Sequence, residues 1–247
     1  MKFLLKLFLL QYFMIIILSN SIYGQESKDD VKKAFQIVKK NVAMLDGIGQ
    51  LLVVFNDPSE NSTAILVAME KSDTGWIAKS DPIRVDIGRN GFAAPGSKRE
   101  SDGKSPSGLF RMGLLFCYQK THVTRMPYLQ TTNEDKWIDD QNSKDYNRHV
   151  RGKTDAKSYE NLKIRSDAYK YCMVIEYNTH PVVKGMGSAI FFHLFEEIPG
   201  PTAGCVALNE KDMEWVLAWM NPKFKPSIIM GNEKVLVSGL TKVVSVY

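Results

Sequence analysis

Residues 187–208, GSAIFFHLFEEIPGPTAGCVAL, combine an apolar run typical of a buried strand with a turn rich in glycine and proline. Side chains alternate along an extended strand, so Ala189, Phe191 and His193 share one face of the predicted strand. Eleven residues separate His193 from Cys205, enough for the chain to fold back and bring the thiol beside the imidazole. On spacing alone two interpretations stay open: the two side chains form one site, or the histidine is a hydrogen-bonded structural residue and the Gly-Cys pair belongs to an ordinary turn.

A cysteine and a histidine in this arrangement can perform acyl transfer. The thiolate is the nucleophilic form of cysteine, and a neighbouring imidazole lowers the thiol pKa by accepting its proton. Gly204 permits a backbone conformation in which the amides of Gly204 and Cys205 converge on a developing oxyanion, and such donors contribute roughly 2.7–4 kcal/mol each. Thr202 and Ala203 complete the turn. We expect Cys205 to be the most accessible of the three thiols and to form an ion pair with His193, its base.

The other two cysteines have different surroundings. Cys117 and Cys172 lie in the apolar, strand-like runs GLLFCYQ and YKYCMVIEY. Cysteine in such runs behaves as a small buried apolar residue, so core packing and a mutual disulfide both remain open for this pair. Because the chain has three cysteines, at least one of them either stays a free thiol or forms a disulfide with another molecule.

The remaining sequence predicts a mainly β fold, a sandwich or barrel with a few peripheral helices. From Gln50 onward, short β-branched and aromatic runs alternate with turn residues. Helical spacing predicts one helix over about residues 29–44, and a second that starts after Asn209 and stops at Pro222. Residues 121–170 are polar, and we expect long loops over the sheet. The predicted strands are QLLVVFN, STAILVAME, GWIAKS, IRVDIG, GLFRMGLLFCY, YCMVIEYN, SAIFFHLF and SIIMG.

Residues 1–24 have the pattern of a secretory signal peptide. Lys2 and Lys6 precede an apolar run, and a small residue, Gly24, follows a short polar stretch. The run is shorter than the roughly 20 residues that span a bilayer, so we expect cleavage and no stable membrane anchor afterwards. We therefore expect the mature protein to be exported. Loss of the two lysines lowers the formal net charge from +5 to +3.

Length and composition favour one main domain. The 247 residues, 44% of them apolar, suffice for one sizeable core. We divide the chain into the signal peptide, a helical segment at 25–48 and a catalytic domain at 49–247. The 32 basic residues are scattered among 27 acidic ones without a basic stripe, which argues against nucleic acid as a partner.

The turn motif resembles that of the L,D-transpeptidase catalytic domain family (YkuD-type). The family signature is a histidine, a loop of about a dozen residues or more, and then Ser or Thr, any residue, Gly and Cys. The corresponding residues of this chain are His193, Thr202, Ala203, Gly204 and Cys205.

The resemblance extends upstream of the motif. KRESDGKSPSGLFRMG, residues 98–113, is similar to the family's DGKTP-G-F stretch, and residues 177–193 are similar to its lead-in strand. WIDDQNSKDYN, residues 137–147, is similar to a loop of the same branch. The substrate-binding residues that this resemblance implies are Arg99, Lys104, Tyr146 and Asn147.

The resemblance implies a β-sandwich with a cleft under a loop lid, and peptidoglycan stem peptides as substrate. Cys205 would attack the carbonyl of an L-centre residue that is joined to a terminal D-amino acid, with His193 as general base. The thioester would pass to an amine, giving a cross-link, or to water, giving a shortened peptide. A carbapenem would mimic the substrate. The resemblance implies no metal and no organic cofactor.

The chain also departs from the family pattern. Many members have glycine after the histidine and arginine soon after the cysteine, but Leu194 and Val206 follow here. The group that orients the imidazole is therefore unassigned, and a backbone carbonyl is one option. The alternative functions are an inactive wall-binding protein of the same fold and an unrelated cysteine peptidase. A zinc site formed by His180, His193 and Cys205 is disfavoured because short ligand spacings are missing.

Overall fold

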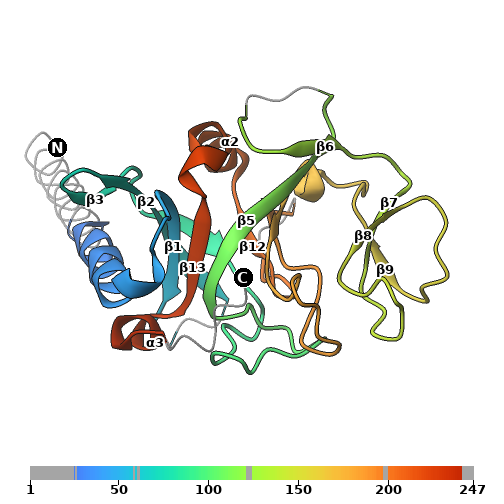
Figure 1. Cartoon of the computed structure of the whole chain (residues 1–247), viewed down its shortest axis with the longest axis horizontal. Helices are drawn as coiled ribbons and strands as arrows, with labels where there is room; N and C mark the ends of the chain where they lie inside the picture. The colour runs from blue at the N-terminus through green and yellow to red at the C-terminus, as the bar shows by residue number, and fades with distance from the viewer. Residues whose placement is uncertain are drawn as a thin grey trace, which may run out of the picture.

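The protein is described by a computed structural model that covers residues 25, 27–57, 59, 62–120, 124–196 and 200–240. Its regular structure is mostly β, with few helices, so the predicted fold class is confirmed (Figure 1). The predicted signal peptide, 1–24, lies outside the described residues. No helix within the described ranges is long and apolar enough to cross a membrane.

The main sheet has ten strands and closes on itself. They are β1 (Gln50–Asn56), β2 (Thr63–Ser72), β3 (Gly75–Ala78), β4 (Ile83–Asp86), β5 (Gly108–Cys117), β6 (Tyr128–Gln130), β10 (Tyr171–Ile175), β11 (Phe191–Leu194), β12 (Val206–Leu208) and β13 (Ser227–Asn232). The path β1-β13-β5-β10-β11-β12-β4-β2 returns to β1, which pairs in parallel with β13 and antiparallel with β2. β3 and β6 pair with β2 and β5 outside this ring. The eight predicted runs all form strands, whereas β6 and β12 were not predicted.

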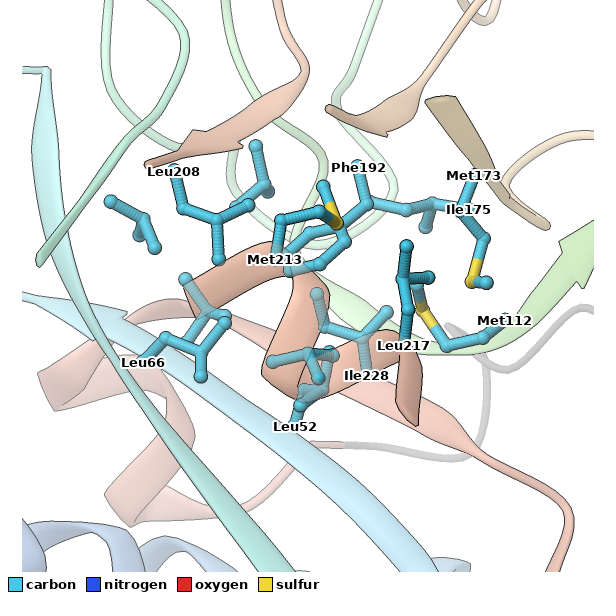
Figure 2. Close-up of a cluster of buried hydrophobic side chains, with 14 of the residues drawn as sticks. Leu52, Leu66, Met112, Met173, Ile175, Phe192, Leu208, Met213, Leu217 and Ile228 are labelled. Carbon is cyan, nitrogen blue, oxygen red and sulfur yellow. The ribbon is translucent and has the colours of Figure 1, made fainter. Parts of the chain in front are cut away.

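The largest core cluster forms around helix α2 (Glu210–Trp219). The predicted cap is present, since Asn209 Oδ1 accepts a hydrogen bond from the Asp212 N–H at 2.9 Å. The buried side of α2 packs against apolar side chains from the ring of strands (Figure 2). The residues of α2 and the segment that follows it in this cluster are Met213, Val216, Leu217 and Met220.

A second core cluster lies under the N-terminal helix. Residues 27–40 are helical, close to the predicted range, and Ala34, Ile37 and Val38 are buried against Val53 and other side chains of the sheet. The short helix α3 (Glu233–Ser238), which was not predicted, contributes to the same cluster. Three 3-10 helices, η1 (Val42–Met44), η2 (Asp167–Tyr169) and η3 (Pro222–Phe224), complete the described helical elements.

The prediction of loops across 121–170 was wrong for part of that region. A separate antiparallel sheet forms there from β7 (Asp135–Ile138), β8 (His149–Arg151) and β9 (Tyr159–Asn161), at one side of the molecule in Figure 1. Burial raises the pKa of Asp135, but hydrogen bonds from Arg151 and Thr132 outweigh it and hold that pKa well below its usual range. This ionised carboxylate ties two strands of the small sheet together.

The small sheet packs on the main sheet through aromatic contacts. Trp137 of β7 meets Phe116 of β5 and Phe191 of β11 edge to face, with ring centroids 6.3 and 5.3 Å apart. A third core cluster, which includes these rings and Cys205, lies between the two sheets. The small sheet therefore covers the face of β11 that carries His193.

Candidate active site

β11 and β12 place His193 and Cys205 on the same face of the main sheet. The two strands pair in parallel, with His193 opposite Ala207. Cys205 lies two positions before Ala207, and side chains alternate along a strand, so Cys205 projects toward the same side as His193. The two residues that the sequence singled out are thus neighbours on adjacent strands.

A cavity of about 410 Å³ opens on this face and is lined by both residues. Thr202 and Ala203 of the predicted turn also line it. A larger cavity of about 540 Å³ lies between the N-terminal helix and the sheet, but it shares no lining residue with the first and contains neither a cysteine nor a histidine. The other residues around the smaller cavity are Glu160, Asn161, Ile164, Tyr169, Glu196, Gly200, Pro201 and Ala207.

The His193 ring is oriented by a backbone carbonyl and by one aromatic ring. Nδ1 lies 2.7 Å from the carbonyl oxygen of Leu194, to which its N–H donates. This tautomer leaves Nε2 without a proton, as a base requires. The edge of Tyr169 contacts the imidazole, with ring centroids 5.2 Å apart. Burial lowers the pKa of His193 to about 4, so the ring is neutral at pH 7. The carbonyl of Leu194 is the orienting group that the sequence left unassigned.

Cys205 is held as a neutral thiol. Sγ donates to the carbonyl oxygen of Ala189 at 3.3 Å and accepts a hydrogen bond from the N–H of Phe191 at 3.4 Å. Burial raises the pKa of Cys205 to about 12, and the negative charge of Glu160 acts in the same direction. The positive charge of Lys98 opposes this rise only weakly.

The expectation of an ion pair between thiolate and imidazolium was therefore wrong for the free protein, whereas Cys205 is the most accessible of the three thiols, as expected. Cys205 is only 6% exposed, although Cys117 and Cys172 are fully buried. Within the described ranges, no hydrogen bond joins Sγ to the imidazole of His193. Both groups have lost water without gaining an opposite charge, and desolvation disfavours the charged form of each. The resting site is a neutral pair.

The turn before Cys205 requires glycine at position 204. Gly204 has φ +152°, and a Cβ there would lie 2.8 Å from the carbonyl oxygen of Lys104. Thr202 closes the turn, because its hydroxyl donates to the Cys205 carbonyl at 2.8 Å and accepts from the Gly204 N–H at 3.1 Å. The predicted oxyanion site therefore loses one donor. The N–H of Cys205 has no hydrogen bond to another described residue, and it stays available.

The segment 98–106 packs against this turn and bonds to it. Ser105 Oγ donates to the carbonyl of Cys205 at 3.2 Å and accepts from the N–H of Gly88 at 2.9 Å. Asp102 holds the segment's own shape by accepting from Lys98 Nζ at 2.6 Å and from the Lys104 N–H at 2.8 Å. The DGKSP motif thus positions the cysteine turn.

The two basic residues predicted to bind substrate do not line the cavity. Arg99 is exposed and donates to the carbonyls of Gly96 and Lys98, at 3.2 and 2.7 Å. Lys104 approaches the turn through its backbone. A role for either side chain in binding substrate stays a prediction, one that requires substrate to extend beyond the cavity.

Tyr146 and Asn147 are buried behind the site and do not line the cavity. The Asn147 side chain accepts from the N–H of Ala189 at 3.1 Å and from Trp137 Nε1 at 2.8 Å, while the Tyr146 hydroxyl donates to Glu100. Ala189, which has φ +52°, is the residue whose carbonyl accepts from Cys205 Sγ. These contacts indicate that the pair holds the backbone around the thiol, and direct contact with substrate stays a prediction.

Two cavity residues, Glu160 and Tyr169, were missed by sequence reasoning. Both come from the region interpreted as loops, where YEN and DAY are too short to show periodicity. The hydroxyl of Tyr169 donates to a carboxylate oxygen of Glu160. No local sequence signal marks either residue, because Glu160 is placed by the packing of the small sheet and Tyr169 by the packing of η2 on the main sheet.

Cys117 and Cys172 are free thiols on opposite faces of the main sheet. Cys117 belongs to the cluster around α2, whereas Cys172 belongs to the cluster that contains Cys205. Of the two alternatives left open by the sequence, the disulfide between Cys117 and Cys172 is therefore excluded in this structure, and core packing is observed. Burial raises the pKa of both thiols.

The described residues contain no cluster of three or more His, Cys, Asp or Glu side chains that could hold a metal ion. His180, the third ligand of the disfavoured zinc site, is exposed and does not line the cavity. The site chemistry that these residues can supply is that of a thiol, an imidazole and backbone amides.

Comparison with known proteins gives one match. The family model described as YkuD, L,D-transpeptidase catalytic domain, matches residues 55–237, about three quarters of the chain. The match includes the three-stranded sheet, every strand of the main sheet except most of β1, and every residue of the cavity. No curated protein and no solved structure matches.

Proposed function

Because the chain belongs to the L,D-transpeptidase catalytic domain family, we propose that it is a cysteine acyltransferase that acts on peptidoglycan stem peptides. Cys205 is the nucleophile and His193 is the general base. The donor is a peptide in which an L-centre residue is joined to a terminal D-amino acid. The proposal needs no metal and no organic cofactor.

One observation carries this assignment. His193 and Cys205 project from one face of adjacent parallel strands into one cavity, and the base already has the required tautomer. A nucleophile and its base must lie within reach of each other, and the base must be oriented by a third group. The Leu194 carbonyl provides that orientation.

The first step is a rotation of the Cys205 side chain. In the free protein, Sγ donates to the Ala189 carbonyl. Rotation about the Cα–Cβ bond would break this weak bond and turn the S–H toward Nε2 of His193. The imidazole then takes the proton as the sulfur attacks the carbonyl carbon, so the charged pair forms only during reaction. Catalytic hydrogen bonds often tighten only when substrate binds.

Attack places a negative charge on the substrate oxygen, and the free N–H of Cys205 is the donor best placed to stabilise it. One such donor is worth about 2.7–4 kcal/mol in the transition state. Collapse of the tetrahedral intermediate breaks the C–N bond, and the imidazolium of His193 gives its proton to the leaving amine. The product is a thioester on Cys205 and a free D-amino acid.

The thioester has two possible fates. An amine from a neighbouring stem peptide can attack it after losing a proton to His193, which gives a cross-link and restores the thiol. Water can attack in the same way and gives a shortened peptide. The cavity favours neither acceptor by its size, since about 410 Å³ admits either.

Export belongs to the same proposal. The pattern of residues 1–24 supports a cleaved signal peptide, and peptidoglycan lies outside the cytoplasmic membrane. We therefore propose that the mature protein works in the periplasm or at the cell wall, with no membrane anchor after cleavage.

A second candidate function is a catalytically inactive peptidoglycan-binding protein of the same fold. The neutral, buried thiol favours it, because Sγ is bonded to Ala189 in place of His193. Incubation of the mature protein with purified tetrapeptide muropeptides, followed by mass analysis, separates the candidates. Dimers indicate transpeptidation and tripeptides indicate carboxypeptidase action. Unchanged muropeptides with a folded protein would favour the binding protein.

A further inference from the structure

The cavity is acidic, although the chain as a whole is basic. Its lining includes two carboxylates, Glu160 and Glu196, and neither lysine nor arginine. His193 is neutral at pH 7 because burial lowers its pKa. The chain has a formal net charge of +5. Local charge in the cavity thus opposes the charge of the protein, which points to a cationic ligand.

Glu160 is fixed in position by two elements. It lies on β9 opposite Trp137 of β7, whose ring packs against Phe191 in the main sheet. One carboxylate oxygen accepts from the hydroxyl of Tyr169. Within the described ranges, the second oxygen has no hydrogen bond, and no ion pair involves Glu160. Glu160 lines the cavity, and half of the acceptor capacity of its carboxylate is unused.

Tyr169 connects this carboxylate to the base. Its ring meets His193 and Phe191 edge to face, with centroids 5.2 and 5.9 Å apart, while its hydroxyl bonds to Glu160. A single rigid ring thus sets the distance between the free oxygen of Glu160 and the imidazole. A substrate group held at Glu160 would be held at a fixed distance from the reacting carbonyl.

We propose that Glu160 is a specificity-determining residue that binds an ammonium group of the acyl donor, with Tyr169 as the residue that positions it. This inference rests on the proposed function for the identity of the donor. A partly buried carboxylate without a cation is unfavourable in the free protein, and burial raises the pKa of Glu160. A bound ammonium would remove that penalty, so part of the binding free energy depends on the charge of the ligand.

The ammonium belongs to the donor and not to the attacking amine. A neighbouring carboxylate favours the protonated form of an amine. A protonated amine has no lone pair and cannot attack the thioester. An amine held by Glu160 is therefore a recognition group, which fits a side-chain amine on the residue that becomes acylated.

Binding of an ammonium group at Glu160 would also make the thiol of Cys205 easier to ionise. The negative charge of Glu160 helps to raise the pKa of the Cys205 thiol. An ammonium bound beside that carboxylate cancels its effect on Sγ, so a cationic donor eases the loss of the thiol proton. A neutral donor of the same shape would bind more weakly and would leave the thiol harder to ionise.

The test uses two donor peptides that differ only in one side chain, lysine or the neutral isostere norleucine. Binding is measured by calorimetry on the full mature chain with Cys205→Ala, which cannot react, and turnover is measured with Cys205 intact. We expect the lysine donor to bind about 10-fold or more tightly than the norleucine donor, as for a hydrogen bond to a charged group.

Glu160→Gln keeps an acceptor for Tyr169 but removes the charge, and should bring the affinities of the two donors within about twofold of each other. The matched control is Glu134→Gln at an exposed position just before β7, which should keep the full preference.

Equal binding of the two donors would overturn the inference, as would a preference that survives Glu160→Gln in a folded protein. Failure of both donors to bind would overturn it as well. A lysine preference that disappears in Glu160→Gln, without turnover of either donor, would support the ammonium site and contradict the proposed function. Turnover of both donors without a preference for lysine would support the proposed function and contradict the ammonium site at Glu160.

Discussion

The two faces of β11 and β12 have opposite characters, although they come from alternate residues of the same strands. One face packs against α2 and is entirely apolar. The other lines the cavity and carries a thiol and an imidazole. The residues of the apolar face are Phe192, Leu194, Val206 and Leu208, and those of the cavity face are Phe191, His193, Cys205 and Ala207.

This difference shows how stability and chemistry are divided in the fold. The apolar face gains free energy from burial, about 25 cal/mol for each Å² removed from water. The cavity face holds an imidazole and a thiol in neutral form, because burial without an opposite charge beside them disfavours the charged form of each. A substitution on the first face should therefore change stability, and one on the second should change activity.

The largest expected effect is on the apolar face. Phe192 is fully buried in the cluster around α2, so Phe192→Ala should lower the free energy of unfolding by about 3–5 kcal/mol. Urea unfolding followed by circular dichroism measures it. Phe224→Ala, at a side chain that is 47% exposed, is the control and should change it by less than about 0.5 kcal/mol. A loss below about 1 kcal/mol for Phe192→Ala would show that the two faces do not differ in this way.

The next effect is on the cavity face. His193→Gln should lower kcat/KM by about 10²-fold or more, because the thiol loses its base. The free energy of unfolding at pH 7 should change little, since the buried ring is already neutral. His180→Gln, at an exposed position, is the matched control and should keep the activity. Full activity in a folded His193→Gln protein would remove His193 from the mechanism.

A smaller effect comes from the pKa of His193. Burial lowers this pKa to about 4, whereas an unfolded chain titrates near 6.5. Between these values the unfolded chain binds a proton that the folded chain does not, so stability is complete above pH 6.5 and falls as the pH is lowered toward 4. Between pH 7 and pH 4.5, we expect the wild type to lose about 2 kcal/mol more than His193→Gln. Parallel losses in the two proteins would mean that the imidazole is not desolvated.

The smallest effect concerns the turn. Thr202→Ala removes the hydroxyl that bonds to the Cys205 carbonyl and the Gly204 N–H, and should cost about 1 kcal/mol of stability. Thr202→Ser keeps the hydroxyl and should recover most of that loss. Thermal unfolding of the three proteins provides the comparison. Equal losses in both variants would assign the effect to the methyl group.

The sequence predicted the parts of this architecture that depend on local patterns. Long apolar runs such as β1, and the Asn209 cap of α2, carry their signal in consecutive residues. The resemblance of the segment from His193 to Cys205 to the family signature also predicted that the two residues belong to one site, and both line the cavity. β12 was missed because it has only three residues after a turn, too few to show the alternation of apolar and polar side chains that marks a strand.

The sequence failed where the outcome depends on packing between distant segments. Glu160 reaches the cavity because the small sheet packs on Phe116 and Phe191, and Tyr169 reaches it because η2 packs on β10 and β11. Neither contact has a local sequence pattern. The ionisation state of Cys205 was predicted wrongly for the same reason. An imidazole nearby favours the thiolate, but desolvation of both groups is larger, and burial is not visible in a motif.

The most direct test of the central claim is the mass of the intact protein after incubation with a carbapenem, which presents a strained carbonyl to the nucleophile. We predict one adduct on the wild type, on Cys117→Ser and on Cys172→Ser, and none on Cys205→Ser, because the hydroxyl has a far higher pKa than the thiol. Circular dichroism confirms that each variant is folded. An adduct that survives Cys205→Ser, or none on the folded wild type, would contradict the assignment of Cys205 as the nucleophile.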